Sequence, residues 1–131
     1  MAPAADSAPK RVLVVDNEAG ICALLREVLA RDGLAVSVAE DGLQAFAELR
    51  GGGFDLLVTD LTMPGMNGGE LIAALGELAA PPRVLIVSGF LDAATERSLG
   101  EHPLVCGVFR KPFDVFEFAQ RACEIVHGGG G

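Results

Sequence analysis

Five times along this chain of 131 residues, a short apolar run precedes a segment whose apolar residues have helical spacing. The first run, RVLVVD at 11–16, is rich in valine and ends in an acid, which is typical of a strand buried on both faces. In the next segment, predicted as a helix over 18–31, apolar residues recur every three or four positions from Ile21 to Leu29. Parallel strands need such helices as crossovers, so the alternation predicts a parallel sheet with helices on both faces.

The other four units repeat this pattern. Strands are predicted at 34–40, 54–60, 83–88 and 103–109, and helices at 41–50, 69–78, 91–99 and 113–126. The strand 34–40 alternates apolar and polar residues, as a half-buried strand at a sheet edge does, and Asp41 is placed to cap the helix after it. The segment TMPGMNG at 62–68 is predicted to be a loop because it holds proline and glycine.

Composition limits the class of protein. Half of the residues are apolar and 21% are charged, which suits one packed domain rather than a disordered chain. Eighteen acidic against ten basic residues give a charge of −8, the wrong sign for direct binding of nucleic acid. No apolar run approaches the ~18 residues of a membrane span, so we expect a cytoplasmic protein without membrane contact. The three cysteines are widely spaced and odd in number, which favours neither disulfides nor zinc and indicates a reducing compartment.

The two ends of the chain differ from the rest. Residues 1–10 are rich in alanine and proline, and residues 128–131 are all glycine. We expect both to be disordered tails around one domain at 11–127, with no output domain in either tail.

Polar residues gather where the predicted strands end. Ligands of such sheets bind beyond the carboxyl ends of the strands. Two carboxylates, a hydroxyl and an ammonium group at one edge provide a cation site, a nucleophile and anion stabilisers, which is the equipment for phosphoryl transfer. The residues are Asp16, Asn17, Asp60, Ser88, Lys111 and Pro112.

The sequences around these positions carry a resemblance. VLVVDNE, DLLVTDLTMPGMNGGEL, VLIVSG and FRKPF occur in this order between Lys10 and Val126. In motif and spacing the chain resembles the receiver domain of bacterial two-component response regulators. The resemblance implies a flavodoxin-like α/β fold of five strand–helix units with strand order 2-1-3-4-5. It also implies transfer of a phosphoryl group from a histidine kinase or a histidine phosphotransfer protein to an aspartate, with Mg²⁺ required.

Residue by residue, the resemblance implies a metal site and a phosphoacceptor. Asp60 matches the phosphoacceptor, and Asp16 matches the first acid of the pair that holds Mg²⁺. The backbone carbonyl of Thr62 matches a further metal ligand. Asn17 stands where the second acid usually ligates the metal, so its amide oxygen can still coordinate but one negative charge is missing. With Asp16 and Asp60 as the only nearby carboxylates, we expect weaker binding of Mg²⁺.

Other positions imply stabilisation and switching. Ser88 matches the hydroxyl residue that reaches the phosphoryl oxygen, and Lys111 matches the lysine that pairs with the acceptor carboxylate. Pro112 matches a proline that often follows a cis peptide bond. Val108 stands where the family usually has an aromatic switch residue, so that switch is expected to be absent. Phe90 either shields the phosphoryl group from water or packs on the neighbouring helix.

Three classes of function follow from these observations. The leading one is a single-domain response regulator, not an enzyme beyond its own phosphoryl transfer and dephosphorylation. It would signal to a downstream protein through the face formed by 91–99, 103–109 and 113–126. The alternative is a pseudo-receiver that binds partners without being phosphorylated, which Asn17 and Val108 favour. A flavin protein or an aspartate-based phosphatase is disfavoured, because no glycine-rich loop follows the first strand and the DxD spacing is absent.

Overall fold

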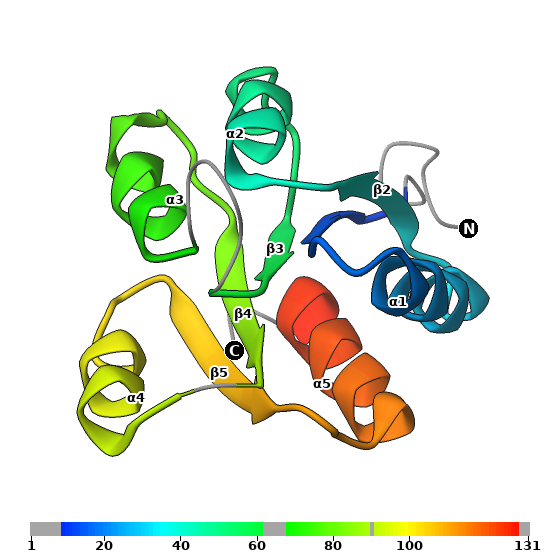
Figure 1. Cartoon of the computed structure of the whole chain (residues 1–131). Coiled ribbons are helices and arrows are strands. Elements are labelled where there is room, and N and C mark those ends of the chain that lie inside the picture. The colour runs from blue at the N-terminus through cyan, green and yellow to red at the C-terminus, as the bar shows by residue number, and fades with distance from the viewer. Residues whose placement is uncertain (1–8, 62–67, 90, 129–131) are drawn as a thin grey trace.

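Within residues 9–61, 68–89 and 91–128, which are the ones the structure describes, five parallel strands form one sheet (Figure 1). In this computed structural model their order is β2-β1-β3-β4-β5, which confirms the predicted α/β fold. The strands are β1 (Arg11–Val15), β2 (Ala35–Ala39), β3 (Leu56–Thr59), β4 (Arg83–Ser88) and β5 (Val105–Arg110). The helices are α1 (Ala19–Arg31), α2 (Gly42–Arg50), α3 (Gly68–Ala74), α4 (Ala93–Gly100) and α5 (Val115–Gly128).

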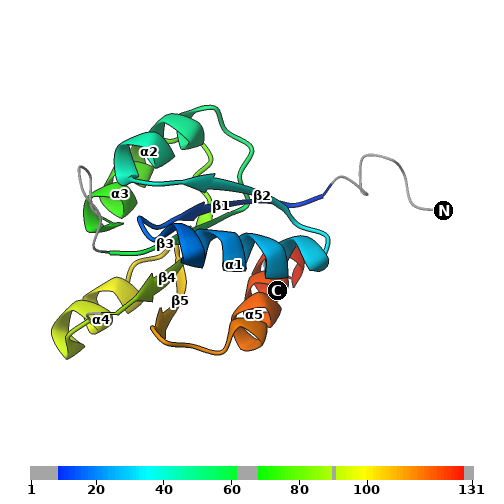
Figure 2. The ribbon, with the colours of Figure 1, turned by 45° about the vertical axis from the view of Figure 1, so that its right-hand side comes forward.

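Each face of the sheet carries its own core. In β1, Val12 and Val14 pack into a first core with α1 and α5, whereas Leu13 and Val15 pack into a second core with α2 and α3. All four side chains are fully buried, because successive residues of a strand covered on both faces point to opposite sides. Figures 1 and 2 both place α1 beside α5 on one side and α2 beside α3 on the other.

Aspartate side chains cap three of these helices at their N-termini. Asp41 and Asp92 each accept a hydrogen bond from the backbone N–H three residues ahead, at 2.8 and 2.7 Å, where α2 and α4 begin. Asp114 accepts one from the N–H two residues ahead, at 2.8 Å, where α5 begins. These bonds satisfy N–H groups that have no partner within the helix. The cap predicted at Asp41 is confirmed.

The third predicted helix differs from the structure. The sequence predicts it over 69–78, but α3 ends at Ala74 and a single 3-10 turn, η2 (Leu75–Glu77), follows. Gly76 lies inside that turn, and glycine in a helix interior costs about 1 kcal/mol relative to alanine. The remaining elements agree with their predicted bounds to within two residues.

The predicted tails and loop fall largely outside the described residues. These are residues 1–8 and 129–131 of the tails and 62–67 of the loop. Gly128, expected in the C-terminal tail, is instead the last residue of α5. Among the described helices, none combines the length and the apolarity that crossing a bilayer requires.

α4 is attached to the sheet mainly through β5. No residue of α4 is buried, although Leu99 packs against the second core. Arg110, the last residue of β5, donates a hydrogen bond from Nη1 to the carbonyl oxygen of Leu91 at 2.7 Å and pairs with Glu96. Because Arg110 immediately precedes Lys111, the contacts that hold α4 begin one residue from the polar edge of the sheet.

Candidate functional site

Two buried carboxylates follow neighbouring strands at the same edge of the sheet. Asp16 follows β1 and Asp60 follows β3, and these strands pair in parallel. The backbone N–H of Asp60 donates to the carbonyl oxygen of Val15 at 3.0 Å, so the ladder continues to the residue itself. Asp16 is 1% exposed and Asp60 is 6% exposed. Carboxylates are costly to bury unless hydrogen-bond donors or cations compensate them, so this edge needs a positive charge.

Lys111 supplies this charge from the end of β5. Its backbone N–H donates to the carbonyl oxygen of Ser88 at 2.8 Å, which fixes the lysine beside the end of β4. Its Nζ donates to Oδ2 of Asp16 at 2.7 Å and to Oδ2 of Asp60 at 3.2 Å. Partial burial by itself lowers the pKa of Lys111. Hydrogen bonds to Asp16 and Glu18 and the charges of Asp16 and Asp60 outweigh this effect and raise the pKa above its ordinary value.

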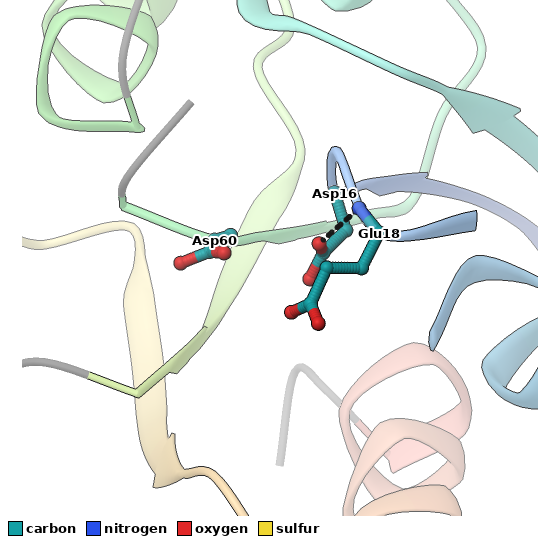
Figure 3. Close-up of side chains that lie close together, drawn as sticks. All are labelled: Asp16, Glu18 and Asp60. Carbon is teal, nitrogen blue, oxygen red and sulfur yellow. Dashed lines mark hydrogen bonds between the residues drawn. The ribbon is translucent and has the colours of Figure 1, made fainter. Parts of the chain in front are cut away.

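Glu18 brings a third carboxylate to the same ammonium group. Its Oε1 accepts a hydrogen bond from Lys111 Nζ at 3.0 Å, and its backbone N–H donates to Oδ1 of Asp16 at 2.8 Å. Figure 3 shows Asp16 and Glu18 side by side beyond β1, with Asp60 beyond the neighbouring strand. One oxygen of each of the three carboxylates lies within 4.8 Å of the others. The expectation that Asp16 and Asp60 are the only nearby carboxylates is therefore wrong.

The sequence held one signal for Glu18 that our reasoning missed. The motif VVDNE places a glutamate two residues after Asp16. Asn17, which precedes it, is exposed and lines a cavity with Asp16 and Glu40 near the end of β2. Glu18 and Lys111 line a different cavity, near the start of α5. The expected role of Asn17 as a metal ligand stays a prediction.

The other predicted site residues are placed as follows. Ser88 is the last residue of β4 and is 1% exposed. Val108 is partly buried and packs against the second core. The peptide bond before Pro112 is cis, as the resemblance led us to expect. Thr62 and Phe90 lie outside the described residues, so their roles stay predictions.

The chemistry of the donor set fits a hard divalent cation. Asp16, Glu18 and Asp60 offer carboxylate oxygens, the ligands that Mg²⁺ prefers in proteins. Formally, these three negative charges exceed the single positive charge of Lys111 by two. One Mg²⁺ would neutralise that excess, so the residues present suit this ion in charge as well as in ligand type.

Comparison with known proteins identifies the family. The family model of the response regulator receiver domain matches residues 12–122. The chain belongs to this family. Receiver domains are signalling domains of two-component systems that interact with histidine kinases or phosphotransfer proteins and bind Mg²⁺ at an acidic site.

Individual relatives agree with this assignment. The protein-glutamate methylesterase/protein-glutamine glutaminase 5 of Myxococcus xanthus is 46% identical over 101 residues, which are 76% of this chain and 28% of that protein. The sporulation initiation phosphotransferase F of Bacillus subtilis is 33% identical over 82% of this chain and 86% of its own length. The response regulator protein TrrA of Thermotoga maritima, solved in complex with Mg²⁺-BeF, is 26% identical. The structural match covers 88% of this chain and 98% of the TrrA chain, with a TM-score of 0.76.

The receiver accounts for only part of many of its relatives. Besides the 28% noted for the Myxococcus protein, the chain spans less than half the length of several relatives named as transcriptional regulatory proteins. The activities of those whole proteins therefore do not transfer to this receiver.

Proposed function

We propose that this receiver accepts a phosphoryl group on Asp60 from the phosphohistidine of a histidine kinase or a histidine phosphotransfer protein. The observation that carries the proposal is the shared ammonium group of Lys111, which contacts Asp60 and Asp16 at the carboxyl edge of the sheet. A carboxylate is a weak nucleophile toward a phosphoryl group, whose oxygens repel it. The arrangement places a positive charge where that repulsion must be overcome.

The transfer forms one bond and breaks one. A carboxylate oxygen of Asp60 bonds to phosphorus while the bond between phosphorus and the donor's imidazole nitrogen breaks. The electron pair of the broken bond stays on the imidazole, which takes up a proton from solvent. Mg²⁺, when bound, neutralises charge on the phosphoryl oxygens.

The chain's own residues hold the reacting groups. Asp16 and Glu18 carry the negative charge that attracts the cation, and Lys111 stays near Asp60 to balance the new phosphoryl oxygens. Ser88, at the buried end of β4, is proposed to donate its hydroxyl to a phosphoryl oxygen. That the related TrrA was solved in complex with Mg²⁺-BeF supports the binding of Mg²⁺ by this receiver.

We propose that the signal leaves through the face formed by α4, β5 and α5. α4 has no buried residue, and in β5 residues 105–109 are only partly buried and Arg110 is exposed. Arg110 links this face to Lys111 through its contacts with Leu91 and Glu96. A downstream protein is the proposed reader, in the cytoplasm, where the thiols of all three cysteines stay free as they are here.

Phosphorylation by a small-molecule donor tests this function. The protein is incubated with Mg²⁺ and acetyl phosphate, and its intact mass is measured. We expect a gain of one phosphoryl group, lost in Asp60→Asn because the amide is no nucleophile. Asp55→Asn is the matched control, since Asp55 precedes β3 and binds the backbone N–H of Arg11 instead. Equal labelling of Asp60→Asn and the unchanged protein would contradict the assignment.

A pseudo-receiver is the second candidate, favoured by the amide at Asn17. Complete absence of labelling by acetyl phosphate and by a phosphoramidate donor, in protein that binds Mg²⁺, would favour it. The third carboxylate at Glu18 argues against it, because it offsets the charge that Asn17 lacks.

A further inference from the structure

Because position 17 holds an amide instead of an acid, the site lacks one negative charge. The neighbouring Glu18 is placed to supply it. With Asp16, Asp60 and Lys111 alone, the edge would carry a formal excess of one negative charge, and a bound Mg²⁺ would overcompensate it. Glu18 raises this excess to two, which matches the ion. Charge matching of this kind strengthens binding because a divalent cation gains interaction energy with each nearby carboxylate.

We infer that Glu18 is the replacement acid of this receiver: it supplies the cation site with the carboxylate that Asn17 lacks. The inference rests on the proposed function and adds a residue to its site. Its basis is geometric, since the carboxylate of Glu18 meets those of Asp16 and Asp60 within 4.8 Å (Figure 3).

A cation already occupies the meeting point of these carboxylates. Lys111 Nζ lies 3.0 Å from Oε1 of Glu18, 2.7 Å from Oδ2 of Asp16 and 3.2 Å from Oδ2 of Asp60. Oxygens of all three carboxylates therefore already converge on one positive charge. Asn17 is exposed and lines another cavity, whereas Glu18, one residue later, lines the same cavity as Lys111.

The backbone fixes where Glu18 begins, and its side chain retains freedom to follow the cation. The backbone N–H of Glu18 donates to Oδ1 of Asp16 at 2.8 Å, which ties the two acids together. The side chain of Glu18 is 61% exposed, whereas that of Asp16 is 0% exposed. An exposed glutamate loses little hydration when it turns toward an ion. Glu18 can therefore bind Lys111 when Mg²⁺ is absent and bind the ion when Mg²⁺ is present.

A purely structural role for Glu18 makes a different prediction. A glutamate that only holds Lys111 through a partly exposed ion pair contributes to stability by at most a small amount. Its removal would leave the affinity for Mg²⁺ nearly unchanged. The affinity of the unphosphorylated protein for Mg²⁺ therefore separates the two roles.

The test is calorimetric titration of Mg²⁺ into the unphosphorylated protein and three variants. Glu18→Gln should weaken binding roughly 5- to 30-fold, the effect of one charge at a partly hydrated site. Glu40→Gln is the matched control, because Glu40 lines the cavity of Asp16 and Asn17 but lies outside the carboxylate cluster. It should change the affinity less than about two-fold. Adding Asn17→Asp to Glu18→Gln should restore most of the lost affinity.

Each result decides the inference. Glu18→Gln with unchanged affinity, or Glu40→Gln with an equal loss, would overturn it while leaving phosphorylation at Asp60 intact. A loss that Asn17→Asp fails to restore would also overturn it, because Glu18 would then act through Lys111 rather than as the missing acid. No binding of Mg²⁺ by the unchanged protein would reject the proposed function itself.

Discussion

The ammonium group of Lys111 lies 2.7 Å from Oδ2 of Asp16, closer than the 3.2 Å that separates it from Oδ2 of Asp60. In the unphosphorylated receiver, the ammonium group therefore lies nearest to Asp16, with Glu18 next at 3.0 Å and the proposed phosphoacceptor Asp60 third. The contact joins residues that follow β5 and β1, with β3 and β4 between these strands. It ties both sides of the site together across the sheet.

Replacing Lys111 by methionine should lower the free energy of unfolding without Mg²⁺ by roughly 1–3 kcal/mol, because buried carboxylates lose their compensating charge. Mg²⁺ should reduce this loss by supplying charge to the same oxygens. Urea unfolding followed by far-UV circular dichroism measures both. Arg31→Met is the control, since the Arg31–Glu27 pair is exposed and should contribute less than about 0.5 kcal/mol. Equal losses in the two variants would contradict a special role for Lys111.

The stabilisation by Lys111 should persist into alkaline solution. Its pKa is raised in the folded protein above the ordinary value of about 10.4, so the stabilisation is fully present below that pH. It is lost only as the pH rises through the raised pKa. The difference in unfolding free energy between the unchanged protein and Lys111→Met should stay constant from about pH 7 to about pH 9. A change of that difference within this range would show that Lys111 loses its proton there, which contradicts a raised pKa.

Asn17→Asp should make the metal-free protein less stable. It adds an acid to an edge that already holds three carboxylates, and like charges repel. We expect the melting temperature without Mg²⁺ to fall by roughly 2–6 °C, with recovery when Mg²⁺ is added. Gln120→Glu adds the same charge at an exposed position of α5 and should leave the melting temperature nearly unchanged. An unchanged melting temperature in Asn17→Asp would place residue 17 away from the other acids.

Arg110→Ala should loosen α4 while leaving the rest of the fold intact. The helix has no buried residue, and its N-terminal end is held by the contacts of Arg110 with Leu91 and Glu96. Amide hydrogen exchange in α4 should accelerate several-fold, whereas exchange in β1 and β3 stays unchanged. Arg97→Ala, at an exposed position of α4 itself, is the control. Equal acceleration of exchange in both variants would show that any change in or near α4 loosens this helix, and that the contacts of Arg110 have no special effect.

Phe118→Ala should be the most destabilising of these changes. Phe118 is fully buried on α5, with its ring centroid 5.4 Å from those of Phe109 and Phe113. Removing this ring leaves a cavity in the first core and should cost about 3–5 kcal/mol. Phe116→Ala removes the same ring from a side of α5 where the residue is 69% exposed, and should cost less than about 1 kcal/mol. Chemical unfolding compares the two, and similar costs would contradict the packing of α5.

Local patterns in the sequence were sufficient to predict the strands and helices and the edge of the sheet where the polar groups gather. The buried valines of β1 and the capping Asp41 follow from periodicity and from side-chain chemistry, which act over a few residues. The placement of Asp16, Asp60 and Lys111 at one edge followed from the rule that parallel strands end together. The end of the regular helix α3 before Gly76 could have been predicted by the same local reasoning, but the sequence analysis did not predict it.

The choice between Asn17 and Glu18 was decided only by the tertiary structure. Glu18 and Lys111 are 93 positions apart in the chain, and the sheet brings their charged groups to 3.0 Å. Which of two adjacent polar residues faces the ammonium group depends on the direction in which the chain leaves β1 and on where β5 ends. Neither is encoded in a local pattern, because a side chain in a loop is oriented by the charges that folding brings near it. The sequence by itself therefore determined a receiver-like sheet with an acidic edge, and the tertiary structure decided that the edge holds three acids around one lysine.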